Sequence, residues 1–101
     1  KMKPSWIGIL YGIRGTLFSM RGQYKEAIED CNTGIRMYPH NASLYNIRGK
    51  IYFDLKEYKK AIKDFDMAIK FALENQNTEK QDAIEYKQKA YEALTEMEGK
   101  K

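Results

Sequence analysis

The side chains of this sequence that could do chemistry are few, and their spacing does not suit it. His40 has no neighbour at a metal-ligand spacing. Cys31 is the single cysteine and cannot form an internal disulfide. Acids that lie two residues apart, such as Asp64 and Asp66, point in different directions on a helix and cannot share an acid–base site. We therefore expect no enzyme, no metal site and no cofactor.

The composition is that of one ordinary domain. The chain has 101 residues, a net charge of +4 and 14 acidic residues mixed among the basic ones, so no clustered basic face for nucleic acid is expected. The longest apolar stretch is far short of the ~20 residues that cross a bilayer, which excludes membrane insertion. The lone cysteine suits a reducing compartment, and we expect the cytoplasm. The chain begins with Lys1, which we interpret as a piece of a longer protein.

A repeat of 34 residues organises the sequence. Between residues 8–41 and 42–75, 12 of 34 positions are identical, where about two would match by chance. A period of this length is typical of stacked helical hairpins, which bind other proteins and seldom do chemistry. The matched pairs include Tyr11/Tyr45, Arg14/Arg48, Gly15/Gly49, Tyr24/Tyr58, Ala27/Ala61 and Asp30/Asp64.

Each repeat reads as two helices, and a fifth helix follows. Apolar residues at three- and four-residue steps predict a first helix, which Gly22 ends, and a second helix from Tyr24 to Tyr38. In the second repeat the later helix is expected to run to about Asn75, with a turn at 76–77. A capping box at Thr78 then predicts a closing helix over 79–98, about 30 Å long.

The period and its residue types resemble the tetratricopeptide repeat family. The resemblance implies an all-α fold, a helical-hairpin solenoid of five antiparallel helices. It implies a single domain over 1–101, with repeats at 8–41 and 42–75 and a closing helix at 78–98. The residues that carry it are Tyr11, Gly15, Phe18, Tyr24, Ala27 and Pro39 in the first repeat and Tyr45, Gly49, Tyr52, Tyr58, Ala61 and Phe65 in the second.

Two arginines depart from the family pattern, which has leucine at their position. Arg14 and Arg48 each face a repeated aspartate on the next helix, and we predict the ion pairs Arg14–Asp30 and Arg48–Asp64. The alternative is that all four side chains point to water. If the pairs form at an exposed surface, each is worth under ~1 kcal/mol.

The resemblance also implies a concave groove, lined by the first helix of each repeat, that binds a peptide or helix of a partner protein. Asn46 and the lysines would attract an acidic or carboxylate-bearing segment, unless those lysines are ordinary solvated surface. Phe53 would be an aromatic anchor on a wet face. The expected groove residues are Thr16, Met20, Asn46, Lys50, Phe53, Lys80, Ile84 and Lys87.

One subclass of the family holds the C-terminal carboxylate of chaperones with Lys, Asn, Asn, Lys and Arg at fixed positions. No residue at the corresponding positions matches, which disfavours a chaperone-adaptor role. Those positions hold Gly12, Thr16, Ile47, Asn77 and Gln81.

The first helix is apolar on nearly all of its faces, and a single repeat cannot bury all of this apolar surface. Trp6, Ile7 and Ile13 are therefore expected to meet an upstream helix, a second copy of the chain or a ligand. The alternative is that the second repeat buries them. We expect a non-catalytic interaction module, a scaffold within a larger protein or complex, with self-assembly into a dimer as the second hypothesis.

Overall fold

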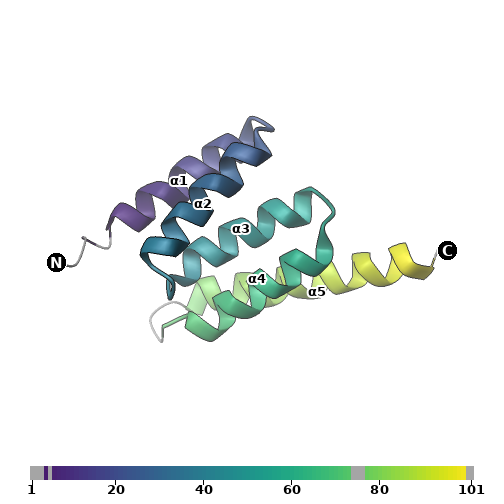
Figure 1. The fold of residues 1–101 in the computed structure, drawn as a ribbon. Helices are drawn as coiled ribbons and strands as arrows, with labels where there is room; N and C mark the ends of the chain where they lie inside the picture. The colour runs from purple at the N-terminus through teal and green to yellow at the C-terminus, as the bar shows by residue number, and fades with distance from the viewer. Residues whose placement is uncertain (1–3, 5, 74–76, 100–101) are drawn as a thin grey trace.

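Five helices and no strand make up the part of the chain that the computed structural model describes, residues 4, 6–73 and 77–99. No helix within these residues is long and apolar enough to cross a membrane. The helices run antiparallel in sequence order (Figure 1). They are α1 (Trp6–Met20), α2 (Tyr24–Met37), α3 (Ala42–Asp54), α4 (Tyr58–Phe71) and α5 (Asn77–Gly99).

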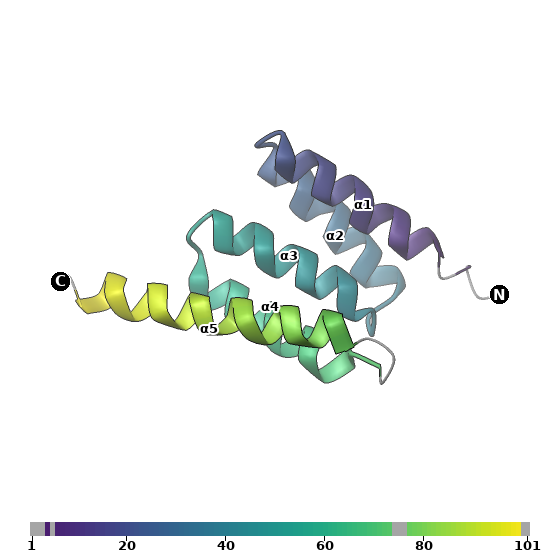
Figure 2. The same ribbon diagram turned by 180° about the vertical axis from the view of Figure 1, so that it is seen from behind.

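The helices form two layers. In one layer α1 packs on α3 and α3 packs on α5. In the other, α2 and α4 each pack against the helices of the first layer, and within the described residues no Cα atom of one lies within 8 Å of a Cα atom of the other. Both views show the α1–α2 pair stacked on the α3–α4 pair, with α5 closing the stack (Figures 1 and 2). We call the layer of α1, α3 and α5 the inner layer, and that of α2 and α4 the outer layer.

Close approach of the paired helices depends on repeated glycines. A Cβ added at Gly49 would lie 2.7 Å from Cε1 of Phe65, and one at Gly15 would lie 3.2 Å from the carbonyl oxygen of Ala27. At 2.7 Å the Phe65 ring would have to shift, and 3.2 Å is tighter than most Cβ contacts, so glycine lets the second helix of each hairpin nest against the first. Phe65 and Cys31 are fully buried beside these positions.

The turn inside each hairpin has the same backbone conformation in both repeats. Gly22 has φ +76° and Lys56, its counterpart 34 residues later, has φ +62°. Both lie in the left-handed region, which glycine adopts freely and lysine does not. At the join between the repeats, the side chain of Asn41 accepts a hydrogen bond of 3.1 Å from the backbone N–H of Leu44 and caps α3.

Two predicted boundaries were wrong. α4 ends at Phe71, not near Asn75, and Ala72 is extended with φ −64° and ψ 127°. The Phe71 ring packs against His40 and Tyr45 at centroid distances of 4.6 and 5.8 Å, which holds the end of α4 against the loop between the repeats. α5 begins at Asn77, so the residue expected to cap it, Thr78, lies inside its first turn. The expected end of α4 and part of the turn fall on residues 74–76, outside the described residues.

Candidate protein-binding face

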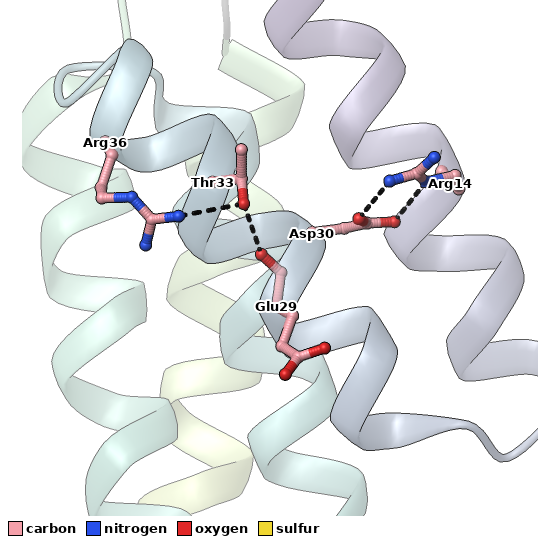
Figure 3. A network of polar contacts seen from close by, with 5 residues as sticks. All are labelled: Arg14, Glu29, Asp30, Thr33 and Arg36. Carbon is pink, nitrogen blue, oxygen red and sulfur yellow. Dashed lines mark hydrogen bonds and ion pairs between the residues drawn. The ribbon is translucent and has the colours of Figure 1, made fainter.

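One arginine–aspartate pair joins the two helices of each hairpin. Nε and Nη2 of Arg14 both donate to the Asp30 carboxylate at 2.7 Å, from α1 to α2 (Figure 3). Arg48 makes the same two bonds to Asp64 at 2.9 and 2.8 Å, from α3 to α4. Both predicted ion pairs are confirmed, and their fork geometry is the strongest that arginine offers a carboxylate.

The two pairs differ in their surroundings. The Arg14 side chain is 62% exposed, whereas that of Arg48 is 21% exposed. Hydrogen bonding to the aspartates raises the pKa of both arginines. Burial raises the pKa of Asp64 above its ordinary value, although Arg48 opposes the shift. The second repeat therefore holds a nearly buried charge that depends on Arg48.

A polar cluster joins α3 to α5 on the inner layer, and we call it the α3–α5 seam: Asn46, Lys50, Glu79, Asp82 and Tyr86. Nδ2 of Asn46 donates to the Glu79 carboxylate at 2.8 Å and to that of Asp82 at 3.3 Å. The Lys50 ammonium pairs with Asp82 and lies 4.9 Å above the centre of the Tyr86 ring. The seam is thus held by charges and amides from both helices.

One acceptor in the seam has no donor. Asn46 is 2% exposed, and its Oδ1 accepts no hydrogen bond from the described residues. The amide orientation is fixed, because turning it over would point Oδ1 at two carboxylates. A buried, unpaired acceptor is unfavourable by about 1–3 kcal/mol. With less than 1 Å² of accessible surface, this oxygen cannot be reached by a partner while the seam is closed.

The α1 side of the inner layer carries the other expected groove residues. Gly12, Thr16 and Met20 follow one another at four-residue steps and share one stripe of the helix. At Gly12 this stripe meets α3, since a Cβ there would lie 3.0 Å from Cδ1 of Ile47. Thr16 and Met20 are exposed, and the Thr16 hydroxyl donates to the Gly12 carbonyl at 2.9 Å. These two side chains are accessible to a partner.

The expected groove residues of α5 are rotated away from α3. Lys87 pairs with Asp66 of α4 at 2.5 Å, which raises the pKa of Lys87. Lys80 and Ile84 share this side of the helix by their three- and four-residue spacing. The residues that α5 turns toward α3 are instead Glu79, Asp82 and Tyr86.

Phe53 is not the exposed anchor that the sequence predicted. Its ring is half-buried and packs edge-on against Tyr58 and Tyr86, at centroid distances of 5.4 and 5.6 Å. Asn46 was also expected to be open to a partner, and only its unpaired oxygen remains unused. Sequence analysis missed Glu79 and Asp82, although two acids three residues apart on one face of a helix were a visible signal.

The apolar N-terminal helix leaves most of its expected association face open. Trp6 and Ile13 are 57% and 52% exposed, while Ile7 is half-buried.

The ring of His40 packs against that of Phe71. Among the residues that the structure describes, no group of three or more His, Cys, Asp or Glu side chains is placed to hold a metal ion.

Comparison with known proteins agrees with this architecture. Residues 42–75 match the family model of the tetratricopeptide repeat. A solved structure, the second tetratricopeptide repeat domain of Spaghetti (RPAP3) bound to the HSP90 peptide SRMEEVD, is similar with a TM-score of 0.64 and 28% sequence identity. The similarity covers 93% of this chain and 84% of that one. No curated protein sequence matches significantly.

Proposed function

We propose that this chain, a tetratricopeptide repeat domain, binds a segment of a partner protein along its inner layer. Domains of this family are non-catalytic protein-interaction modules. The partner would lie across the Thr16–Met20 stripe of α1 and the α3–α5 seam. The observation that carries the proposal is the exposed pair Thr16 and Met20, on the stripe of α1 that meets α3 at Gly12.

The chemistry of the partner is constrained by the charges already in place. Lys50 and Lys87 are paired with Asp82 and Asp66, so neither is free to attract an acidic segment. Lys80 alone keeps the role expected of the groove lysines, and it lies on the α4 side of α5. We therefore propose that apolar and uncharged polar groups, rather than carboxylates, dominate recognition. Exposed Met20 supplies an adaptable apolar contact.

Affinity measurements on surface variants test this proposal. Peptides selected on the intact domain from a random display library serve as probes. Thr16→Arg and Met20→Glu change exposed side chains, and each is expected to weaken binding at least ~10-fold. Lys25→Glu, on the exposed surface of α2, is the matched control and should leave affinity within about twofold. Selected peptides whose affinity falls with the Lys25 variant and not with the α1 variants would refute the assignment.

A chaperone-adaptor role stays disfavoured for this chain. The similar domain of Spaghetti binds an HSP90 peptide, SRMEEVD, that carries three acidic side chains. Here none of the five positions expected to hold such a carboxylate terminus is basic. We expect SRMEEVD to bind with a Kd weaker than about 100 μM. Salt-sensitive binding below about 10 μM would show that the acidic class of partner had been dismissed wrongly.

Self-association is a second candidate, because Trp6 and Ile13 are exposed together on α1. Light scattering coupled to gel filtration tests it: a stable dimer that Trp6→Glu disperses would support it, and a strict monomer at high concentration would exclude it. We propose the cytoplasm as the compartment, on the support of one buried, unpaired thiol at Cys31.

A further inference from the structure

The two repeats treat the same three apolar positions differently. Leu10, Ile13 and Leu17 lie on α1 at three- and four-residue steps, and we call them the outer face of α1. They are 53%, 52% and 54% exposed. Their counterparts 34 residues later on α3 are covered: Leu44 and Ile51 are 1% and 2% exposed, and Ile47 is half-buried.

The cover in the second repeat is a helix with small side chains. A Cβ at Gly34 of α2 would lie 2.9 Å from Cδ1 of Leu44, so this glycine admits the leucine. Ile51 packs in one cluster with Ala27 and Cys31 of the same helix. Small residues at steps of four and three thus form the surface that receives the apolar residues of the next hairpin.

A polar contact accompanies this packing. Nη1 of Arg48, the guanidinium nitrogen not used by Asp64, donates to Oδ1 of Asn32 on α2 at 2.7 Å. The equivalent Arg14 uses Nε and Nη2 for Asp30, and its Nη1 has no acceptor among the described residues. Arg14 borders an apolar hollow of about 480 Å³ that Leu10 and Leu17 help to line. This face therefore offers the apolar groups and the donor that α3 offers to α2.

We infer that the outer face of α1 docks another repeat hairpin, stacked on α1 as the α1–α2 hairpin is stacked on α3. Its second helix presents small residues at the spacing of Ala27, Cys31 and Gly34, and a side-chain carbonyl oxygen that accepts from Nη1 of Arg14. α1 lies at the edge of the stack, where such a hairpin continues the succession (Figures 1 and 2). The inference concerns a surface separate from the proposed partner-binding face, and it competes with self-association for the exposed side chain of Ile13.

A second copy of this chain does not meet these requirements. Its own small-residue surfaces are already covered, since Ala27, Cys31, Ala61 and Ala68 are 0% exposed. The apolar side chains that it exposes are large ones. They include those of its own outer face of α1, which carries the same arginine, and Ile84, Tyr91 and Met97 of α5. The interface between the two hairpins of this chain is instead continued by a hairpin of the same kind.

The chain supplies its own probe for the experiment. Joining residues 1–41 directly to residues 8–101 continues the period, and it places a copy of α2 against the outer face of the downstream α1. The added Asn41 remains at the start of that helix. The fused protein is expected to unfold at a temperature at least ~5 °C higher than the original chain. An unchanged unfolding temperature would overturn the inference.

The variant Ile13→Glu provides the control, because the same substitution is made in two surroundings. In the original chain, where Ile13 is exposed, it should change the unfolding temperature by less than ~3 °C. In the downstream helix of the fused protein it should lower that temperature by more than ~8 °C, since the carboxylate then takes the half-buried place of Ile47, against the cluster of Ala27 and Cys31. Equal small effects in both proteins would overturn the inference. So would a stable dimer of the original chain that Ile13→Glu disperses, because a second copy would then be the occupant.

Discussion

Replacing Arg48 by leucine is expected to destabilise the protein by about 2–4 kcal/mol at pH 7. Arg48 makes two charged hydrogen bonds to Asp64 and a third to Asn32, all between 2.7 and 2.9 Å. Removing one partner of a buried pair costs about 3–5 kcal/mol, because it leaves the other charge without compensation. We lower that range because the Arg48 side chain is 21% exposed. Leucine also restores some apolar burial at this position.

The loss should depend on pH. Burial already raises the pKa of Asp64, and without Arg48 the largest opposing influence is gone, so the pKa of Asp64 rises further. A carboxyl whose folded pKa lies above its unfolded pKa is favoured in the folded state when protonated. Its contribution is complete below the unfolded pKa, near 4, and is lost as the pH rises through the folded value. The gap in stability between the variant and the original chain should therefore be widest at neutral pH and narrow toward pH 4.

Urea denaturation followed by circular dichroism at pH 7 and pH 4 measures both effects. Arg14→Leu is the matched control. The Asp30 side chain that it leaves is also only 9% exposed, but Arg14 is 62% exposed and makes two hydrogen bonds rather than three, so the loss should be smaller. The double variant Arg48→Leu/Asp64→Ala should recover part of the loss, which gives the coupling between the pair. The reasoning fails if Arg48→Leu matches the original chain at both pH values, or if the Arg14 variant loses as much.

Three further predictions follow from single positions. Gly49→Ala should cost about 1–3 kcal/mol through overlap with Phe65, and an unchanged urea midpoint would show that the helices can move apart. Lys56→Gly should stabilise the protein by up to about 1 kcal/mol and Gly22→Ala should destabilise it, because both residues have a left-handed backbone that glycine adopts most easily. Changes of the same sign in the unfolding temperature of the two variants would contradict this. Burial raises the pKa of Cys31 to about 12, so a disulfide reagent at pH 8 should label the folded protein at least ~100-fold more slowly than the unfolded chain, and equal rates would disprove the burial.

The hairpins and the ion pairs could be predicted because each is written twice in the sequence. Gly15 and Gly49 occupy the same position in the two repeats and allow the same close approach of paired helices. The pair of Arg14 and Asp30 likewise recurs as Arg48 and Asp64. A repeated pair at a fixed lag implies a repeated contact, and this needs no knowledge of distant parts of the chain.

The closing helix could not be oriented in the same way. The expected groove residues Lys80, Ile84 and Lys87 follow from extending the period, but the rotation of α5 depends on contacts of its own. Lys87 pairs with α4 and Asp82 with Lys50 of α3, and the sequence does not say which of many charges meet. The end of α4 was misplaced for a similar reason, because Phe71 packs on His40, a residue of the distant loop.

The most direct test of the proposed binding face is backbone amide shift mapping of the ¹⁵N-labelled domain as a library-selected peptide is added. The account predicts that the largest shifts fall on Thr16 and Met20 of α1 and on Lys50 and Asp82, whose side chains in the seam are 38% and 36% exposed. Shifts gathered on α2 and α4, with the inner layer unchanged, would contradict it.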